Sequence, residues 1–163
     1  MTSDAARLSE LSNAVRESSL KRLRLVPTGR ENWRPAEGAL SFADIARHLI
    51  DCDEWLFRKL VDPRIAAIEA QPGIAVVTDR AEFDALIDRL AVLGGLRGKL
   101  IAGLAGGELA ALVPDERFGG EVSIWWVIAR GNLDHEAHHR GQLAVYLRLV
   151  ESGWAAPDAS RDA

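Results

Sequence analysis

Four segments of the sequence carry apolar residues at alternating steps of three and four, which is the spacing that places side chains on one face of an α-helix. These segments cover residues of about 3–26, 41–61, 78–104 and 123–150. Stretches with proline and glycine separate them. Because such helices bury their apolar faces against one another, the pattern predicts an all-α four-helix bundle. We expect a single domain over residues 1–154 and a disordered tail over the small, polar residues 155–163.

Local signals predict where several of these helices begin and end. Ser41 followed by Asp44 resembles a capping box at the start of the second helix. Asp79 and Glu82 form a similar pair at the start of the third helix. Gly153 is expected to adopt a left-handed conformation after the fourth helix.

The connections between the helices differ in length. The segment over residues 62–77 contains two prolines and is long enough to traverse a bundle, so the second and third helices need not be antiparallel. Glycines at 94, 95 and 98 predict a kink or early break in the third helix, since each costs roughly 1 kcal/mol against alanine. We expect the segments 27–40 and 105–120 to be loops that shape the mouth of a pocket.

The composition excludes several classes of function. A charged fraction of 27%, a net charge of −4 and a pI near 5.6 argue against nucleic-acid binding, which requires a basic surface. No stretch approaches the ~20 apolar residues of a membrane helix, and the N-terminus lacks the layout of a signal peptide. The single cysteine, Cys52, suits a reducing compartment. We therefore expect a cytoplasmic protein that acts on a small molecule.

The four histidines all fall at positions expected to face the interior of the bundle. His135 and His139 are one turn apart and only ~40° apart around the helix axis, so their imidazoles can share one ion. Spacing alone also permits the pair of His135 and His138. His48 lies in the apolar stripe of the second helix. Apolar positions continue through the fourth helix, with His138 and Val145 expected on the buried face.

A metal ion would satisfy several of these buried nitrogens together, each of which costs about 1–3 kcal/mol if left unpaired. Neutral imidazoles suit divalent zinc, nickel or iron, and also copper, and three protein ligands leave a position for water or substrate. Cys52 lies one turn after His48 and is either a fourth ligand or, as we favour, a small core residue. Trp55 is a candidate wall of the pocket. Candidates to orient the ligating rings are Asp51, Asp134, Glu136, His138 and Gln142.

The segment from His135 to Leu143, with sequence HEAHHRGQL, resembles the signature of the DinB-like family of metal-binding four-helix bundles. The remaining positions that carry the resemblance are Trp33, Ser41 and His48, so it spans nearly the whole chain. The resemblance implies that the metal ligands are His48, His135 and His139, and that the helices run in up-down-down-up order. It also implies a homodimer that does not bind DNA.

Three functions stay open at this stage. The resemblance implies a metal-dependent enzyme, most often a thiol S-transferase or isomerase in which the ion activates a low-molecular-weight thiol. A non-catalytic, stress-related dimer that binds metal is the alternative. His135, Glu136 and His139 also match the short zinc-peptidase pattern, but Gln142 and Val145 occupy positions where an extended protease signature has glycine and histidine.

Overall fold

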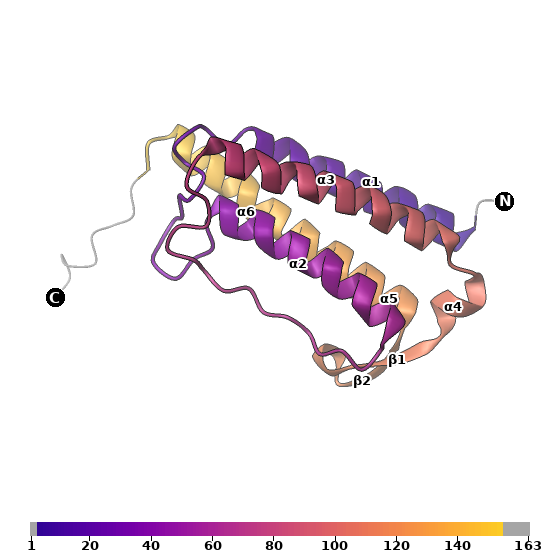
Figure 1. Ribbon diagram of the computed structural model, residues 1–163. Coiled ribbons are helices and arrows are strands. Elements are labelled where there is room, and N and C mark those ends of the chain that lie inside the picture. Colours follow the sequence, from indigo (N-terminus) through magenta and orange to yellow (C-terminus); the bar gives the residue numbers. More distant parts are fainter. Residues whose placement is uncertain (1–2, 155–163) are drawn as a thin grey trace.

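The computed structural model describes residues 3–154, and within them four long helices form an elongated bundle (Figure 1). The first three are α1 (Asp4–Arg24), α2 (Phe42–Val61) and α3 (Arg80–Gly103). The fourth consists of α5 (Ile124–Ile128), the π-helical segment η2 (Ala129–Leu133) and α6 (Asp134–Glu151), which follow one another without a break. The predicted tail at 155–163 lies outside the described residues. Among the described residues, no helix has the length and apolar character needed to span a membrane.

The order of the helices is up-down-down-up, as predicted. In Figure 1, α1 and the fourth helix run in one direction along the bundle, whereas α2 and α3 both run in the other. α1 packs against α3 and α6, and α2 packs against the same two helices. The parallel pair is possible because the segment that joins α2 to α3 passes along the outside of the bundle (Figure 1).

The helix ends follow the signals in the sequence. The Ser41 hydroxyl accepts a hydrogen bond from the Asp44 backbone N–H at 3.0 Å, and the Asp44 carboxylate accepts one from the Ser41 N–H at 2.9 Å. Asp79 caps α3 by accepting from the Glu82 N–H at 2.9 Å. Gly153 has a φ of 68°, the left-handed conformation expected after the last turn. These predictions are confirmed.

The predicted break in α3 is wrong, because α3 continues through its glycines to Gly103. Two of the glycines lie against α1 instead. A Cβ atom at Gly94 would lie 2.6 Å from Cγ of Arg16, and one at Gly98 would lie 2.4 Å from Oδ1 of Asn13. Because glycine has only a hydrogen atom in place of a side chain, α1 and α3 can approach closely at these two positions. The resulting packing compensates for the low helix propensity of glycine.

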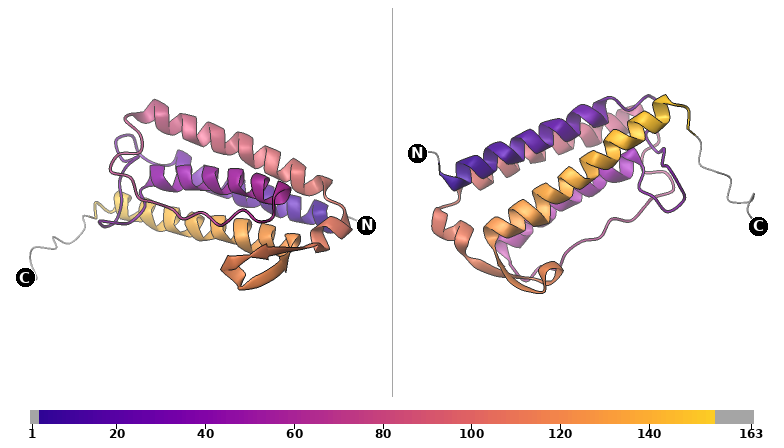
Figure 2. Two further views of the ribbon diagram at one scale, coloured as in Figure 1. Left: turned by 60° about the horizontal axis from the view of Figure 1, so that its bottom comes forward. Right: turned by 180° about the vertical axis from the view of Figure 1, so that it is seen from behind.

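The segment before the fourth helix is not the plain loop that we expected. It forms the short helix α4 (Gly106–Ala110), strand β1 (Leu112–Asp115), a 3₁₀ turn (Glu116–Phe118) and strand β2 (Gly120–Ser123). The strands pair in antiparallel register, with Val113 opposite Val122. Gly119, at a φ of 75°, makes the left-handed turn between them. The resulting β-hairpin lies beside the beginning of the fourth helix (Figure 2).

The π-helical segment changes which face of the fourth helix is buried. The prediction counted alternating steps of three and four, which average about 3.5 residues per turn, whereas an α-helix has about 3.6 and the π-turn contains an additional residue, so the buried positions fall later along the chain. Glu136 and His139 are buried, whereas His138 and Val145 are exposed. The expectation that His138 and Val145 face the interior is therefore wrong.

Candidate metal centre

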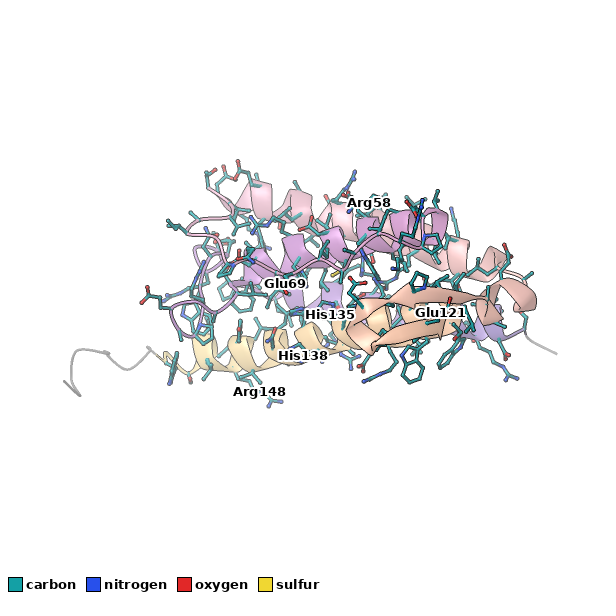
Figure 3. The ribbon with its side chains drawn as sticks, turned by 90° about the horizontal axis from the view of Figure 1, so that it is seen from below. Arg58, Glu69, Glu121, His135, His138 and Arg148 are labelled. Atoms are coloured by element: carbon teal, nitrogen blue, oxygen red, sulfur yellow. The ribbon has the colours of Figure 1, made fainter. Side chains whose placement is uncertain are left out.

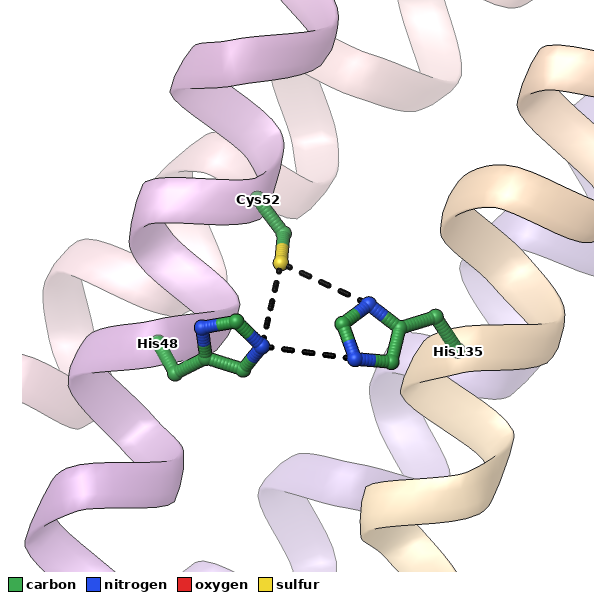
Figure 4. A group of neighbouring side chains, drawn as sticks. All are labelled: His48, Cys52 and His135. Carbon is green, nitrogen blue, oxygen red and sulfur yellow. Dashed lines mark hydrogen bonds between the residues drawn. The ribbon is translucent and has the colours of Figure 1, made fainter. Parts of the chain in front are cut away.

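Side chains from α2 and the fourth helix meet in the middle of the bundle. α2 contributes His48 and Cys52, which are one turn apart, and α6 contributes His135 and His139 with the same spacing. Figure 4 shows His48, Cys52 and His135 pointing toward one another across the two helices. We refer to His48, His135 and His139 as the histidine cluster.

The Nε2 atoms of the histidine cluster converge. Nε2 of His135 lies 3.3 Å from Nε2 of His48 and 3.0 Å from Nε2 of His139. An imidazole nitrogen carries only one proton or one lone pair in the ring plane, so His135 Nε2 cannot make a full hydrogen bond to both neighbours. Two nitrogens bound at ~2.0–2.1 Å to one tetrahedral ion would be about 3.3 Å apart. The donor set therefore fits a divalent metal ion.

Cys52 lies at the side of the cluster. Its Sγ is 3.6 Å from Nε2 of His48 and 3.7 Å from Nδ1 of His135 (Figure 4). The ligand atoms of His48, Cys52 and His135 all lie within 4.8 Å of one another, so these residues also form a set that could hold a metal. The sulfur faces Nδ1 of His135, however, whereas the other two histidines face its Nε2. Burial raises the pKa of the Cys52 thiol to about 12.

The histidine rings are in the protonation state that metal binding requires. Burial, together with repulsion from neighbouring charges, lowers the pKa of His48 and of His135 to about 4. Burial likewise lowers the pKa of His139 to about 4. The three rings are therefore neutral near pH 7 and keep a lone pair for a ligand bond.

Gln142 is the one predicted orienting residue that hydrogen-bonds a ring of the cluster within the described part of the chain. Its Oε1 lies 2.8 Å from Nδ1 of His139. An amide oxygen only accepts, so Nδ1 of His139 donates its proton and Nε2 carries the lone pair that faces the cluster. The sequence could not distinguish Gln142 from the other candidates, because that choice depends on side-chain direction.

The other four orienting candidates have different surroundings. Asp134 forms an ion pair with Arg130, one turn earlier on the helix. Asp51 and His138 are exposed, although the His138 ring lies 5.3 Å from that of His139 between centroids. Glu136 is buried and turned away from the cluster, toward α1 and α3, where it binds Arg16 and Arg97. These four residues therefore do not fix the tautomer of a ligating ring.

A buried charge cluster of Arg16, Asp53, Arg97 and Glu136 lies beside the histidines. Arg97 donates to Asp53 at 2.8 Å and to Glu136 at 2.7 Å, and Nη1 of Arg16 lies 2.8 Å from Asp53. Burial alone would raise the pKa of Glu136, but the hydrogen bond from Arg16 and the charge of Arg97 lower it to about 2. Asp53 follows Cys52 and Glu136 follows His135, so this cluster ties α2 and α6 together at the site.

We did not identify this charge cluster from the sequence. Arg97 falls between Leu93 and Ile101 on the buried stripe of α3, four residues from each. Arg16 occupies a buried position of α1 in the same way. An arginine within an apolar stripe predicts a buried acidic partner, since an unpaired charge is rarely buried. That signal is present in the sequence, but it does not identify which carboxylates pair with the two arginines.

A pocket of about 470 Å³ opens next to the histidine cluster. Cys52 and His135 line it, and so does Trp55, as expected. Figure 3 shows His135 and His138 along α6, next to the hairpin that carries Glu121. Arg117 and Phe118 of that hairpin line the pocket, in agreement with the prediction that residues 105–120 shape its mouth.

The prediction that residues 27–40 shape the pocket mouth is wrong. Trp33 packs at the other end of the bundle, with its ring centroid 5.9 Å from that of Phe42 and 5.7 Å from that of Tyr146. Ile68, from the connection between α2 and α3, takes part in the pocket lining instead. The sequence predicts that Trp33 packs against the bundle, but it does not predict at which end.

Comparisons with known proteins agree with this architecture. Residues 13–143 match the sequence profile of the DinB superfamily. The fold is similar to the crystal structure of a DinB-like protein, YjoA, from Bacillus subtilis, with a TM-score of 0.65. The alignment covers 93% of this chain and 96% of that chain at 18% sequence identity, so it supports the fold alone. No curated protein matches the chain.

Proposed function

Because the chain belongs to the DinB superfamily, we propose that it is a metal-dependent enzyme in which His48, His135 and His139 hold one divalent ion. The proposed reaction is of the S-transferase or isomerase type, in which a small thiol attacks an electrophilic substrate. The observation that carries the proposal is that the Nε2 atoms of two neutral histidines lie within 3.3 Å of Nε2 of His135, which is itself neutral and lines a pocket. Zinc, nickel and iron all suit this donor set.

Each residue of the site has a part in the proposed chemistry. An ion bound by three imidazoles would keep a position for an exogenous ligand and stabilise a thiol there as its thiolate. Gln142 holds His139 in the tautomer that binds metal. Trp55 and Phe118 provide apolar surface for the substrate, and the exposed His138 imidazole is placed to exchange a proton with a bound molecule. A bond forms between the thiol sulfur and a substrate carbon, the thiol proton passes to solvent or His138, and any leaving group departs with its bonding electrons.

A non-catalytic metal-binding protein is the second candidate, and the position of Cys52 favours it. A sulfur 3.6 Å from Nε2 of His48 is close enough to become a fourth ligand after a small side-chain movement. Such a site would have no position for a substrate, and the ion would mainly stabilise the bundle. The absorption spectrum of the Co²⁺-substituted protein distinguishes the two candidates. A Co²⁺–thiolate band that is present in the wild type and lost in Cys52→Ala would support the site in which Cys52 is the fourth ligand.

The zinc-peptidase pattern receives no support from the surroundings of Glu136. In that chemistry the glutamate between the two histidines acts as a general base on metal-bound water. Here the Glu136 carboxylate is 1% exposed and is held by Arg16 and Arg97 on the side away from the pocket. It is therefore not placed to receive a proton from a molecule in the pocket.

The first test is the metal content of the untagged protein, measured by elemental analysis after purification without added metal. We expect about one equivalent in the wild type, loss of the metal in His139→Ala and retention in His138→Ala. His138 is a matched control because it is exposed and adjacent on the same helix. A wild type that contains no metal and takes up none on reconstitution would contradict the proposal.

The second test concerns activity. The metal-loaded wild type is incubated with a panel of small thiols and electrophiles, and conjugates are measured by mass spectrometry against His139→Ala. Metal-dependent conjugation would support the enzyme. Full metal occupancy without conjugation of any pair would favour the non-catalytic candidate.

A further inference from the structure

Arg117 is held rigidly at the wall of the pocket. Its Nε donates to Oδ1 of Asp115 at 2.9 Å and its Nη2 donates to Oδ2 at 2.7 Å, while Nη1 donates to the Gly131 carbonyl at 3.1 Å. Asp115 is 1% exposed, so the carboxylate that orients the guanidinium is itself buried. An arginine fixed at three points loses little additional freedom when it binds a ligand.

Within the described residues, two N–H groups of Arg117 are not used by its neighbours and are available for a ligand. Its guanidinium carbon lies 4.3 Å from the centroid of the Trp55 ring and 5.4 Å from that of Phe118, so two aromatic rings lie against it. The hydrogen bonds to Asp115 and Gly131 use three of its five N–H groups. The side chain is 26% exposed and lines the pocket, so the other two N–H groups can meet a molecule there.

The fourth helix is shaped to accept this arginine. A Cβ atom at Gly131 would lie 2.5 Å from Nη2 of Arg117. Gly131 lies in the π-helical segment, whose wider turn brings its carbonyl to the hairpin. The helix and the hairpin therefore position Arg117 together.

The charges of the pocket select the kind of anion. Arg117 and Arg130 line the pocket, but Asp115 pairs with the first and Asp134 with the second. In the metal-free protein, two positive and two negative groups leave no excess charge to hold a dianion such as a phosphate. A carboxylate carries one charge, and its planar shape matches the N–H groups of a fixed guanidinium. Trp55, Ile68 and Phe118 offer apolar surface for the rest of such a molecule.

We propose that Arg117 binds the carboxylate of an apolar or aromatic monocarboxylic acid in the pocket beside the histidine cluster. This deepens the proposed function by naming the substrate class, and it rests on that function only in taking this pocket as the substrate site. Recognition of the carboxylate itself does not require the ion.

The test compares phenylacetate with its neutral, nearly isosteric analogue phenylacetamide by isothermal titration calorimetry at pH 7. Metal-free and zinc-loaded protein are both titrated. The wild type should bind the carboxylate at least about tenfold more tightly than the amide, since hydrogen bonds to a charged group are stronger than those between neutral groups. In Arg117→Met the preference should disappear while amide binding persists, which also reports that the pocket is folded.

Two further variants complete the design. Arg117→Lys keeps the charge without the planar fork and should lose most of the preference. Arg89→Met removes an exposed arginine that pairs with Glu54 outside the pocket, and it should behave as the wild type. An equal preference in the wild type and Arg117→Met would overturn the inference, as would tighter binding of phenylphosphonate than of phenylacetate to the metal-free protein. A carboxylate preference in a protein that takes up no metal would reject the proposed function but not this inference.

Discussion

Arg97 shows how a single residue can connect the core of this bundle to its site. It lies on α3, is 1% exposed, and donates hydrogen bonds to Ser12, Asp53, Asn132 and Glu136. It therefore contacts residues of α1, α2 and both the π-helical and α-helical parts of the fourth helix. Because its carboxylate partners are buried too, removal of the guanidinium would leave negative charge without compensation in the core.

We predict that Arg97→Met lowers the free energy of unfolding by about 3–5 kcal/mol, the usual effect of breaking a buried ion pair on one side. Urea unfolding followed by circular dichroism measures it. Arg89→Met, which removes an exposed ion pair to Glu54, should change the same quantity by less than about 1 kcal/mol. Equal effects of the two substitutions would show that the buried cluster contributes no more than a surface pair.

At the scale of elements, the sequence predicted helix ends well and helix faces less well. Caps such as Ser41 with Asp44 act within one turn, so neighbouring residues specify them fully. The π-turn at Ala129–Leu133 could not be predicted, because apolar spacing assumes a constant number of residues per turn. This assumption contributed to the wrong placement of His138, which was expected on the buried face of α6 together with His139.

The close contact of α1 with α3 gives a prediction at this scale. Gly98→Ala should lower the free energy of unfolding by about 1–3 kcal/mol, since its Cβ atom would lie 2.4 Å from Oδ1 of Asn13. Gly95→Ala is the matched control, because an added Cβ there meets no atom within 4 Å. It should be neutral or stabilise the protein by up to about 1 kcal/mol through helix propensity. Thermal or urea unfolding of both variants checks this, and a stabilised Gly98→Ala would contradict the packing account.

A second prediction concerns the contact between the hairpin and the fourth helix. Gly131→Ala should displace the guanidinium of Arg117, whose Nη2 would lie 2.5 Å from the new Cβ atom. We expect the preference for phenylacetate over phenylacetamide to fall severalfold while the protein stays folded. Gly141→Ala, on the same helix and facing open space, should leave the preference unchanged. An unaltered preference in Gly131→Ala would mean that this contact does not orient Arg117.

For the whole molecule, four apolar faces predicted the class of the fold, whereas the order of the helices was implied by the family resemblance and is compatible with the long connection after the second helix. The sequence also brought together the residues of the histidine cluster, through their spacing and the resemblance to a family. The pocket was only partly predicted. Arg117 and Ile68 reach it from segments without periodic pattern, and contacts between distant segments leave no trace in local spacing.

Removal of an ion from the proposed metal site gives the prediction at this scale. A ligand that binds only the folded state stabilises it by about 2.7 kcal/mol when present at a hundredfold excess over its Kd. We therefore expect a chelator to lower the Tm of the wild type by several degrees and readdition of zinc to restore it. Differential scanning calorimetry measures both. His139→Ala should show no shift with either treatment, and an identical response in that variant would place the ion elsewhere.

The separation of the two halves of the histidine cluster along the chain affects when the site can exist. His48 and His135 are 87 residues apart in sequence although their rings meet in space. A ribosome-bound chain that has completed the first three helices still lacks two of the three histidines. An ion held by this cluster would therefore be acquired only after the fourth helix has been synthesised, and it would then close a long loop much as a covalent cross-link does. Supply of metal would act on the folded bundle as a step of maturation.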